Sequence, residues 1–135
     1  MNLIIDANIL FSILIKGGKT EELLFQEYLY AYAPEFLLDE FQKYERIILE
    51  KTSRNHEEFK ELVNTLKKRI TMIPNEEIEP FLKEARKISP DKKDVKYFAA
   101  ALKLNCAIWS NDKPLKNQGM IRIYSTKDLI RIFRI

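Results

Sequence analysis

Four acidic residues are the candidates for chemistry in this sequence, and they come from separate parts of the chain: Asp6, Glu40, Asp94 and Asp112. Two of them follow short apolar runs, at residues 3–5 and at residues 106–109. An unbroken apolar run is typical of a strand that is buried on both faces of a parallel sheet. Ligands of such sheets bind beyond the carboxyl ends of the strands. We therefore expect Asp6 and Asp112 to lie at the same edge of one sheet.

The aspartates also have a simpler explanation as helix caps. Asp6 precedes a helix that starts near Asn8, and Asp and Asn are preferred capping residues. Asp91 and Asp94 lie three residues apart at the start of the most helix-like segment, on an edge of its inward face. In a reciprocal capping box, the side chain three residues after the cap binds the backbone N–H of the cap residue, and Glu or Gln does this best. Capping would therefore explain one of these two aspartates well and the second less well. The sequence leaves the capping and the functional explanations open.

Glu40 and Asp39 are adjacent acids in a helix predicted over residues 35–52, and the helical period separates them. The residues three or four positions from Glu40 are Phe36, Leu37 and Tyr44. Glu40 is therefore expected on the inward apolar face, whereas Asp39 has polar neighbours and faces solvent. A carboxylate on a buried stripe is costly without a partner, which makes Glu40 the functional candidate. The alternative is that Glu40 lies at the rim of the stripe and reaches water.

The four carboxylates together predict a metal site. With no Lys or Arg among them they would repel one another strongly, so the arrangement implies a bound cation. Oxygen ligands without a nearby His or Cys favour Mg²⁺ or Mn²⁺ over zinc. Such ions activate a water molecule and stabilise the leaving oxygen of an in-line displacement at phosphorus. No nucleophile elbow, Walker loop or glycine-rich fingerprint suggests another chemistry.

The elements that must position these residues alternate between strands and helices along the chain. Strands are predicted at residues 3–5, 30–33, 70–73, 106–109 and 121–124, and helices at residues 9–15, 20–28, 35–52, 53–68, 75–88, 91–104 and 127–133. This alternation predicts an α/β fold with a central parallel sheet that is covered on both faces. The length of 135 residues, without a linker or repeat, predicts a single domain over residues 1–135.

Composition limits the other classes of protein. Hydrophobic residues make up 46% and charged residues 32% of the chain, which argues against a disordered or fibrous protein. No apolar run approaches the roughly 20 residues of a membrane span, so we expect a cytoplasmic protein without a membrane partner. The single cysteine, Cys106, lies in an apolar run and is expected to be a small core residue. The single histidine, His56, is expected at the surface.

Charge is unevenly distributed. Residues 1–90 carry 13 basic and 16 acidic side chains, whereas residues 91–135 carry 10 basic and 4 acidic ones. A basic surface beside an acid cluster would suit a polyanion whose phosphates also meet a metal ion. The residues that flank the two C-terminal acids are Lys92, Lys93, Lys113 and Lys116. We expect these lysines to contribute to substrate binding.

Four acidic segments, at residues 4–10, 37–41, 91–99 and 109–113, resemble the motifs of the PIN-domain nucleases in the same order. The resemblance implies a compact α/β/α sandwich and an endoribonuclease that depends on Mg²⁺ or Mn²⁺. It also implies frequent homodimers and, for small prokaryotic members, the toxin of a toxin–antitoxin pair with an antitoxin protein as partner and RNA as substrate. By position, Asp6, Glu40, Asp94 and Asp112 match the four acidic residues of the family's site. Asn8 and Ser110 match the polar neighbours that orient ligands or water.

Two other functions remain as alternatives. A phosphatase of the haloacid dehalogenase type also has an acid at the end of a strand, but its chemistry requires a second Asp at the position that Asn8 occupies. A non-catalytic RNA-binding or partner-binding module could use the acids only to hold the fold together. Exposed-looking aromatic residues, including Tyr28, Tyr30 and Phe36, favour self-association, although these rings could instead fill the core.

Overall fold

The computed structural model describes residues 1–135, which are built around a sheet of five parallel strands. The strands lie in the order β3-β2-β1-β4-β5. Their bounds are Asn2–Ile5 (β1), Tyr30–Pro34 (β2), Ile70–Ile73 (β3), Ala107–Trp109 (β4) and Ile123–Tyr124 (β5). β1 is the central strand and has a hydrogen-bonded neighbour on each side, which explains why its residues leave no polar face.

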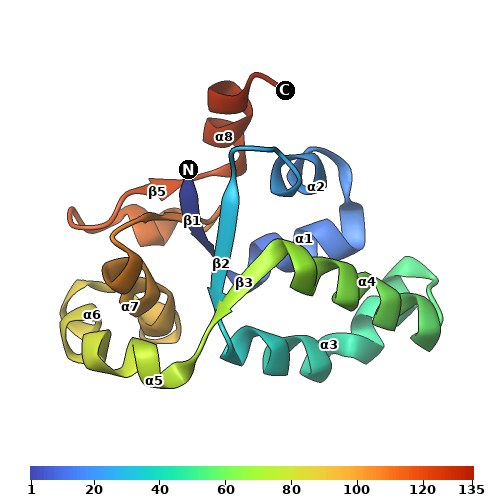
Figure 1. Ribbon diagram of the computed structural model, residues 1–135, viewed down its shortest axis with the longest axis horizontal. Helices are drawn as coiled ribbons and strands as arrows, with labels where there is room; N and C mark the ends of the chain where they lie inside the picture. The colour runs from blue at the N-terminus through green and yellow to red at the C-terminus, as the bar shows by residue number, and fades with distance from the viewer.

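Helices fill the connections between these strands (Figure 1). The α-helices are α1 (Ala7–Lys16), α2 (Gly18–Leu24), α3 (Phe36–Thr52), α4 (His56–Arg69), α5 (Asn75–Ile78), α6 (Leu82–Ile88), α7 (Val95–Leu104) and α8 (Thr126–Phe133). Short 3₁₀ helices are η1 (Glu79–Phe81), η2 (Lys92–Asp94) and η3 (Lys113–Lys116). None of the helices combines the length and the apolar composition that a membrane crossing needs.

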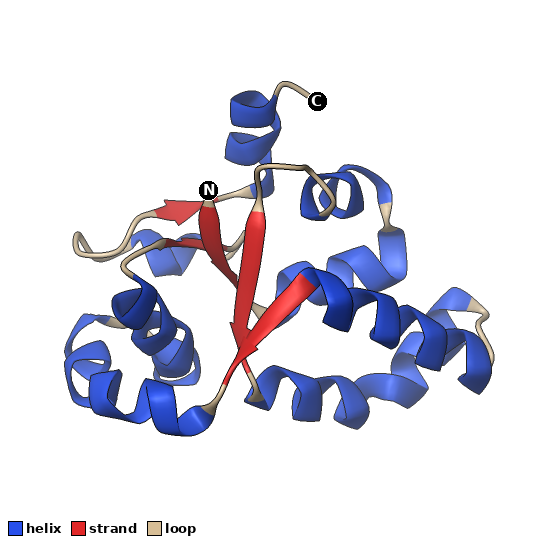
Figure 2. Cartoon of the chain, viewed as in Figure 1, coloured by secondary structure: helices blue, strands red, loops and turns tan.

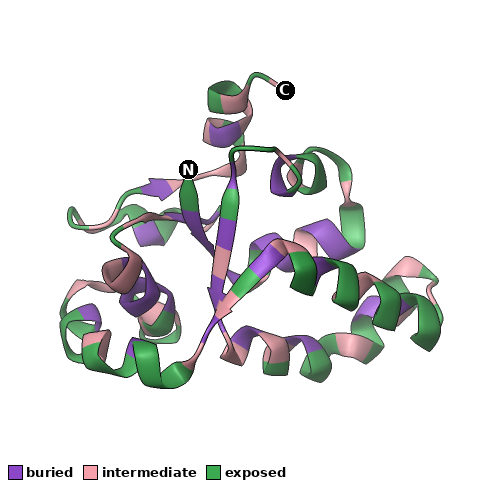
Figure 3. Ribbon diagram, viewed as in Figure 1, coloured by how far each residue is buried: buried purple, intermediate pink, exposed green.

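The sheet separates two hydrophobic cores, because successive side chains of a strand point to opposite faces. Leu3 and Ile5 pack into a core with α1, α2, α3, α4 and α8, whereas Ile4 packs into a core with α5, α6 and α7. Figure 2 shows the strands between these two groups of helices, and Figure 3 shows that burial concentrates on the strands and the inward helix faces. The predicted α/β/α sandwich with a parallel central sheet is therefore confirmed.

The parallel register brings the carboxyl ends of the strands to one edge. Ile4 pairs with Tyr32 of β2 and with Ile108 of β4, so β1, β2 and β4 end close together. In Figure 1, β1, β2 and β3 all run downward towards the starts of α3 and α5. Asp6 follows β1 and Ser110 follows β4 directly at this edge. The fold thus positions the candidate acids from segments far apart in the sequence.

The prediction of one continuous helix over residues 75–88 is wrong. The segment forms α5, the 3₁₀ helix η1 and α6 in succession. Pro80 lies in the middle, where it lacks a backbone N–H and cannot donate the helical hydrogen bond. The interruption turns α6 back so that it packs against α7.

The helix predicted over residues 20–28 is also too long. α2 ends at Leu24, and the guanidinium group of Arg69 binds carbonyl groups at and after this end. Arg69 donates hydrogen bonds to the carbonyl oxygens of Leu24 at 2.5 Å and Leu29 at 2.8 Å, and to that of Gln26. Tyr28 therefore lies outside the helix and is 68% exposed.

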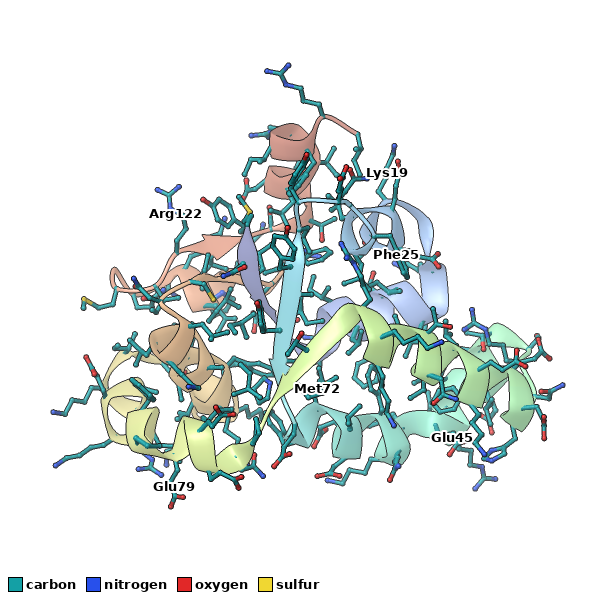
Figure 4. The ribbon with its side chains drawn as sticks, viewed as in Figure 1. Lys19, Phe25, Glu45, Met72, Glu79 and Arg122 are labelled. Carbon is teal, nitrogen blue, oxygen red and sulfur yellow. The ribbon has the colours of Figure 1, made fainter.

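The helix predicted from residue 53 begins later, at His56. Ser53 has a φ of 55° and ends α3, and Asn55 then forms a capping box with Glu58 at the start of α4. His56 is exposed and its Nδ1 lies 2.7 Å from Oε1 of Glu45, a residue labelled on α3 in Figure 4. The surface position expected for His56 is confirmed.

Candidate active site at the carboxyl edge of the sheet

Asp6 lies directly after β1 and is buried, with 4% of its surface exposed. Its Oδ1 accepts a hydrogen bond from the backbone N–H of Ile9 at 3.0 Å, which caps α1. Its Oδ2 accepts a hydrogen bond from the hydroxyl group of Ser110. Asp6 is therefore a helix cap and a member of the edge cluster at the same time, so the two explanations of the sequence do not exclude each other.

Ser110 joins two of the acidic segments. It is 1% exposed, and its Oγ accepts a hydrogen bond from the backbone N–H of Asp112 at 3.1 Å while its hydroxyl proton goes to Asp6. This leaves the hydroxyl group engaged within the protein. Ser110 thus orients the carboxylate of Asp6 and the turn that carries Asp112. Because it is buried, we assign it a positioning role and no contact with solvent.

Asp94 and Asp91 differ in what their carboxylates do. Oδ1 of Asp91 accepts a hydrogen bond from the backbone N–H of Lys93 at 3.0 Å and caps the 3₁₀ helix η2. Asp94 precedes α7, but its side chain makes no capping hydrogen bond. Capping accounts for Asp91 and fails for Asp94. The half-buried Asp94 carboxylate is free to take part in the edge cluster.

Three aspartates influence one another electrostatically. Burial raises the pKa of Asp94 to about 6, and the charges of Asp6 and Asp112 act in the same direction. Burial also raises the pKa of Asp6, with a contribution from Asp112 that the hydrogen bonds from Ser110 and Ile9 oppose. None of the ion pairs in the structure involves Asp6, Asp94 or Asp112. No basic side chain therefore forms an ion pair with these carboxylates, although the charge of Lys93 lowers the pKa of Asp94.

Tyr97 is a residue of the site that the sequence analysis missed. Its hydroxyl oxygen accepts a hydrogen bond from the backbone N–H of Ala7 at 3.1 Å, which ties the start of α1 to α7. Burial raises the pKa of Tyr97, and the negative charges of Asp6, Asp94 and Glu40 act in the same direction. The tyrosine thus stays protonated among the acids. The sequence does carry a feature that could have indicated Tyr97. It lies three residues after Asp94, and residues with this spacing share one face of a helix.

Glu40 lies nearer the rim of the site than the three aspartates. Its side chain is 32% exposed and its Oε1 lies 4.0 Å from Nζ of Lys43. Its charge acts on Tyr97 but is not among the charges that act on Asp6 or Asp94. Asp39 is exposed, as expected. Glu40 therefore lies at the rim of the apolar stripe, which was one of the two placements that the sequence allowed. Its role in the site stays a prediction.

The predicted substrate-binding residues lie around these acids. Asn8 is on the first turn of α1 with an exposed side chain, and Lys92 and Lys93 are exposed on η2 beside Asp94. Lys113 begins η3 directly after Asp112 and is exposed. Lys116 differs, because its Nζ lies 3.6 Å from Oδ2 of Asp128.

A second basic region lies at the edge strand β5. Arg122, labelled in Figure 4, extends away from the sheet there, with its guanidinium carbon 5.6 Å from the centre of the Tyr124 ring. The basic C-terminal third is thus divided between the acidic edge and the region of β5 and α8, where Lys116 is engaged with Asp128.

The acidic edge fits a divalent cation in donor chemistry and in charge. Its donors are carboxylate oxygens, which Mg²⁺ and Mn²⁺ prefer, and their mutual repulsion would be relieved by an ion. No group of three Asp, Glu, His or Cys side chains is arranged in this structure so that it could hold a metal ion directly. Direct ligation of one ion by three of these side chains would therefore require them to move closer together, whereas Mg²⁺ can also bind through one or two carboxylates and keep several waters.

Comparisons with known proteins agree with the geometry. The sequence pattern of the PIN domain matches residues 4–131. The chain belongs to the PIN-domain family. This membership confirms the resemblance drawn from the four acidic segments and supports a nuclease as the general activity. Among curated proteins, no sequence matches the chain.

A solved structure shows the same PIN-domain fold. A chain in the crystal structure of VapBC2 from Rickettsia felis, bound to a DNA fragment from their promoter, superposes with a TM-score of 0.68. The likeness covers 93% of this chain and 98% of that chain at 15% sequence identity. At this identity the likeness supports the shared fold, and the residues of this PIN domain must be judged from its own geometry.

Proposed function

We propose that this PIN-domain protein is a metal-dependent endoribonuclease that hydrolyses RNA phosphodiester bonds at the carboxyl edge of its sheet. The observation that carries the proposal is the set of three mutually repelling aspartates, Asp6, Asp94 and Asp112, none of which forms an ion pair. Nearby like charges without an ion pair cost folding free energy, because each carboxylate disfavours the ionised form of the others. Their repulsion is consistent with a site that binds a cation.

The carboxylates of Asp6, Glu40, Asp94 and Asp112 would hold Mg²⁺ or Mn²⁺. The ion would supply activation of a water molecule and stabilisation of the oxygen that leaves phosphorus. Ser110 and Tyr97 would serve as positioning residues, since one orients the Asp6 carboxylate and the other fixes the backbone beside it. Lys92, Lys93 and Lys113 would contact phosphates of the substrate, and the exposed Asn8 would contact substrate or water at the same edge.

Cleavage of a labelled RNA by the purified full chain tests the proposal. We expect cleavage with Mg²⁺ or Mn²⁺, none in EDTA, and none by Asp6→Asn, which keeps the capping ability of the side chain and removes its charge. Asp39→Asn, a change of the same kind on the exposed face of α3, should cleave like the parent. Equal cleavage by Asp6→Asn and the parent would indicate a contaminating ribonuclease or a wrong site. RNA binding without cleavage would favour the non-catalytic module.

We propose in addition that the protein has an antitoxin partner and forms a homodimer in the cytoplasm. The likeness to a chain of the VapBC2 structure, which is bound to a DNA fragment from their promoter, supports an antitoxin partner. Tyr28 and Tyr30 are exposed and support self-association, whereas Phe36 is half-buried against Tyr97 and does not contribute. Light scattering at micromolar concentration should give twice the mass of one chain, and a single-chain mass would contradict the dimer.

A further inference from the structure

A pocket of about 590 Å³ opens between α6, the loop that follows it and the start of α7. Its apolar lining comes from Leu82 and Val95, and its charged lining comes from Arg86, Lys92 and Lys96. No acidic residue lines it. Figure 1 shows α6 beside α7 at the lower left of the molecule, and the two helices are in contact.

The three basic side chains of the pocket are available to an external anion. None of the ion pairs in the structure involves Arg86, Lys92 or Lys96. Three unpaired cations around one cavity repel one another, and an anion bound among them would relieve that repulsion. Arg and Lys are also the side chains that most often bind phosphate groups in proteins.

The pocket adjoins the acidic edge. Lys92, Val95 and Lys96 lie within two residues of Asp94 and carry the pocket wall up to the start of α7. Nζ of Lys96 lies 4.8 Å from the centre of the Phe36 ring, and that ring lies 5.4 Å from the ring of Tyr97. The basic pocket and the aspartates are thus connected through two aromatic rings.

Local hydrogen bonds fix the loop that forms the rim. The hydroxyl group of Ser89 donates to the carbonyl oxygen of Asp91 at 2.6 Å, and the Asp91 carboxylate accepts from the N–H of Lys93 at 3.0 Å. These bonds hold Lys92 on a defined turn, so the pocket is formed before any ligand binds. A preformed site loses less conformational entropy on binding.

We propose that this pocket binds one nucleotide of single-stranded RNA adjacent to the scissile position, with its phosphate among Arg86, Lys92 and Lys96. The apolar wall of Leu82 and Val95 would contact the ribose or the base. This inference rests on the proposed nuclease function, because it assigns the neighbouring nucleotide of that substrate. It explains why a strongly basic cavity lies beside an acidic cluster, since a polyanion must be held next to carboxylates that repel it.

Binding of a fluorescein-labelled single-stranded oligouridylate in EDTA tests the pocket without cleavage. Arg86→Ala/Lys96→Ala should raise the dissociation constant about tenfold, which corresponds to about 1.4 kcal/mol. The slope of log affinity against log salt should fall by about 0.7 for each RNA phosphate that the variant no longer neutralises. Lys92→Ala alone should show a smaller change in the same direction, and it serves as the second variant if the double variant does not fold.

The matched control is Lys51→Ala/Lys83→Ala, which removes two exposed charges outside the pocket, one of them on α6. Its salt slope should stay close to that of the parent. Equal binding by the control and by the pocket variants, or no binding by the parent, would overturn the inference. Cleavage assays with Mn²⁺ separate the two proposals: a parent that binds RNA through this pocket without cutting it would contradict the nuclease function alone.

Discussion

The hydroxyl group of Ser110 donates a hydrogen bond to the carboxylate of Asp6, and this bond joins residues that are 104 positions apart. Both side chains are buried at the ends of the neighbouring strands β1 and β4. The same Ser110 oxygen accepts from the backbone of Asp112. One serine therefore sets the relative placement of two of the candidate metal ligands.

Ser110→Ala should damage stability and activity together. The change removes one of the two hydrogen bonds that the Asp6 carboxylate accepts and leaves the backbone N–H of Asp112 without its side-chain acceptor, which costs about 1 to 3 kcal/mol of unfolding free energy. Because the hydrogen bond from Ser110 lowers the pKa of Asp6, its loss should move the acidic limb of the activity profile to higher pH. Positioning residues of this kind typically change activity about 10- to 100-fold. Ser12→Ala, in α1 and without a side-chain hydrogen bond, is the control and should behave like the parent.

Asp94→Asn should separate repulsion from metal binding. In EDTA we expect the variant to melt at a higher temperature than the parent. Its free energy of unfolding should be larger by about 1 kcal/mol, after allowing for solvent screening of a half-buried group. An ion at a hundred times its dissociation constant should stabilise the parent by about 2.7 kcal/mol and the variant much less. Asp91→Asn keeps its cap and removes a weaker repulsion on Asp94, so it should raise stability in EDTA less than Asp94→Asn does and should keep the parent's response to Mn²⁺. An unchanged response of Asp94→Asn to Mn²⁺ would exclude Asp94 as a ligand.

The stability of the metal-free protein should depend on pH through the same aspartate. The pKa of Asp94 is raised from 3.8 to about 6 in the folded state, so the folded protein holds this proton more tightly than the unfolded chain. Its stabilising contribution is complete below about pH 4 and is lost as pH rises through 6. Urea unfolding in EDTA at several pH values should show the parent losing stability relative to Asp94→Asn over this range. A constant difference between the two proteins would contradict the raised pKa.

Tyr97→Phe should weaken the contact between α1 and α7. The ring stays in place, but the part-buried N–H of Ala7 loses its acceptor, at a cost of about 1 to 2 kcal/mol. Because Ala7 follows Asp6, cleavage of RNA should slow as well. Tyr30→Phe removes an exposed hydroxyl group with no hydrogen bond to the protein and should change neither property. Wild-type melting and cleavage by Tyr97→Phe would show that the hydrogen bond has no positioning role.

The role of Glu40 can be decided against its neighbour. The charge of Glu40 raises the pKa of Tyr97 from the rim of the site, and Asp39 is exposed one residue earlier on α3. We expect Glu40→Gln to reduce cleavage of RNA and to shift its Mn²⁺ dependence to higher concentration, since a charged oxygen ligand is lost. Asp39→Asn should leave both unchanged. Equal effects of the two substitutions would remove Glu40 from the set of ligands.

The sequence alone determined the architecture and the edge at which the acids gather. An apolar run at residues 3–5 has no solvated face, so it must be a central strand, and an acid that follows such a strand must lie at the carboxyl edge. The same reasoning located Asp112. These patterns are local and strong, because burial on both faces constrains every residue of the strand. The family followed from the order of four such segments.

Tertiary structure decided how the acids are held and which of them are already engaged. The partner of Ser110 and the role of Tyr97 depend on contacts between β1, β4 and α7, which no local periodicity encodes. Capping explained Asp91 and failed for Asp94 because the chain enters α7 through a 3₁₀ turn. The basic pocket arises only when α6 folds back on α7 after Pro80. Hydrogen bonds and cavities between distant segments depend on packing, whereas the sequence specifies directly only the elements that pack.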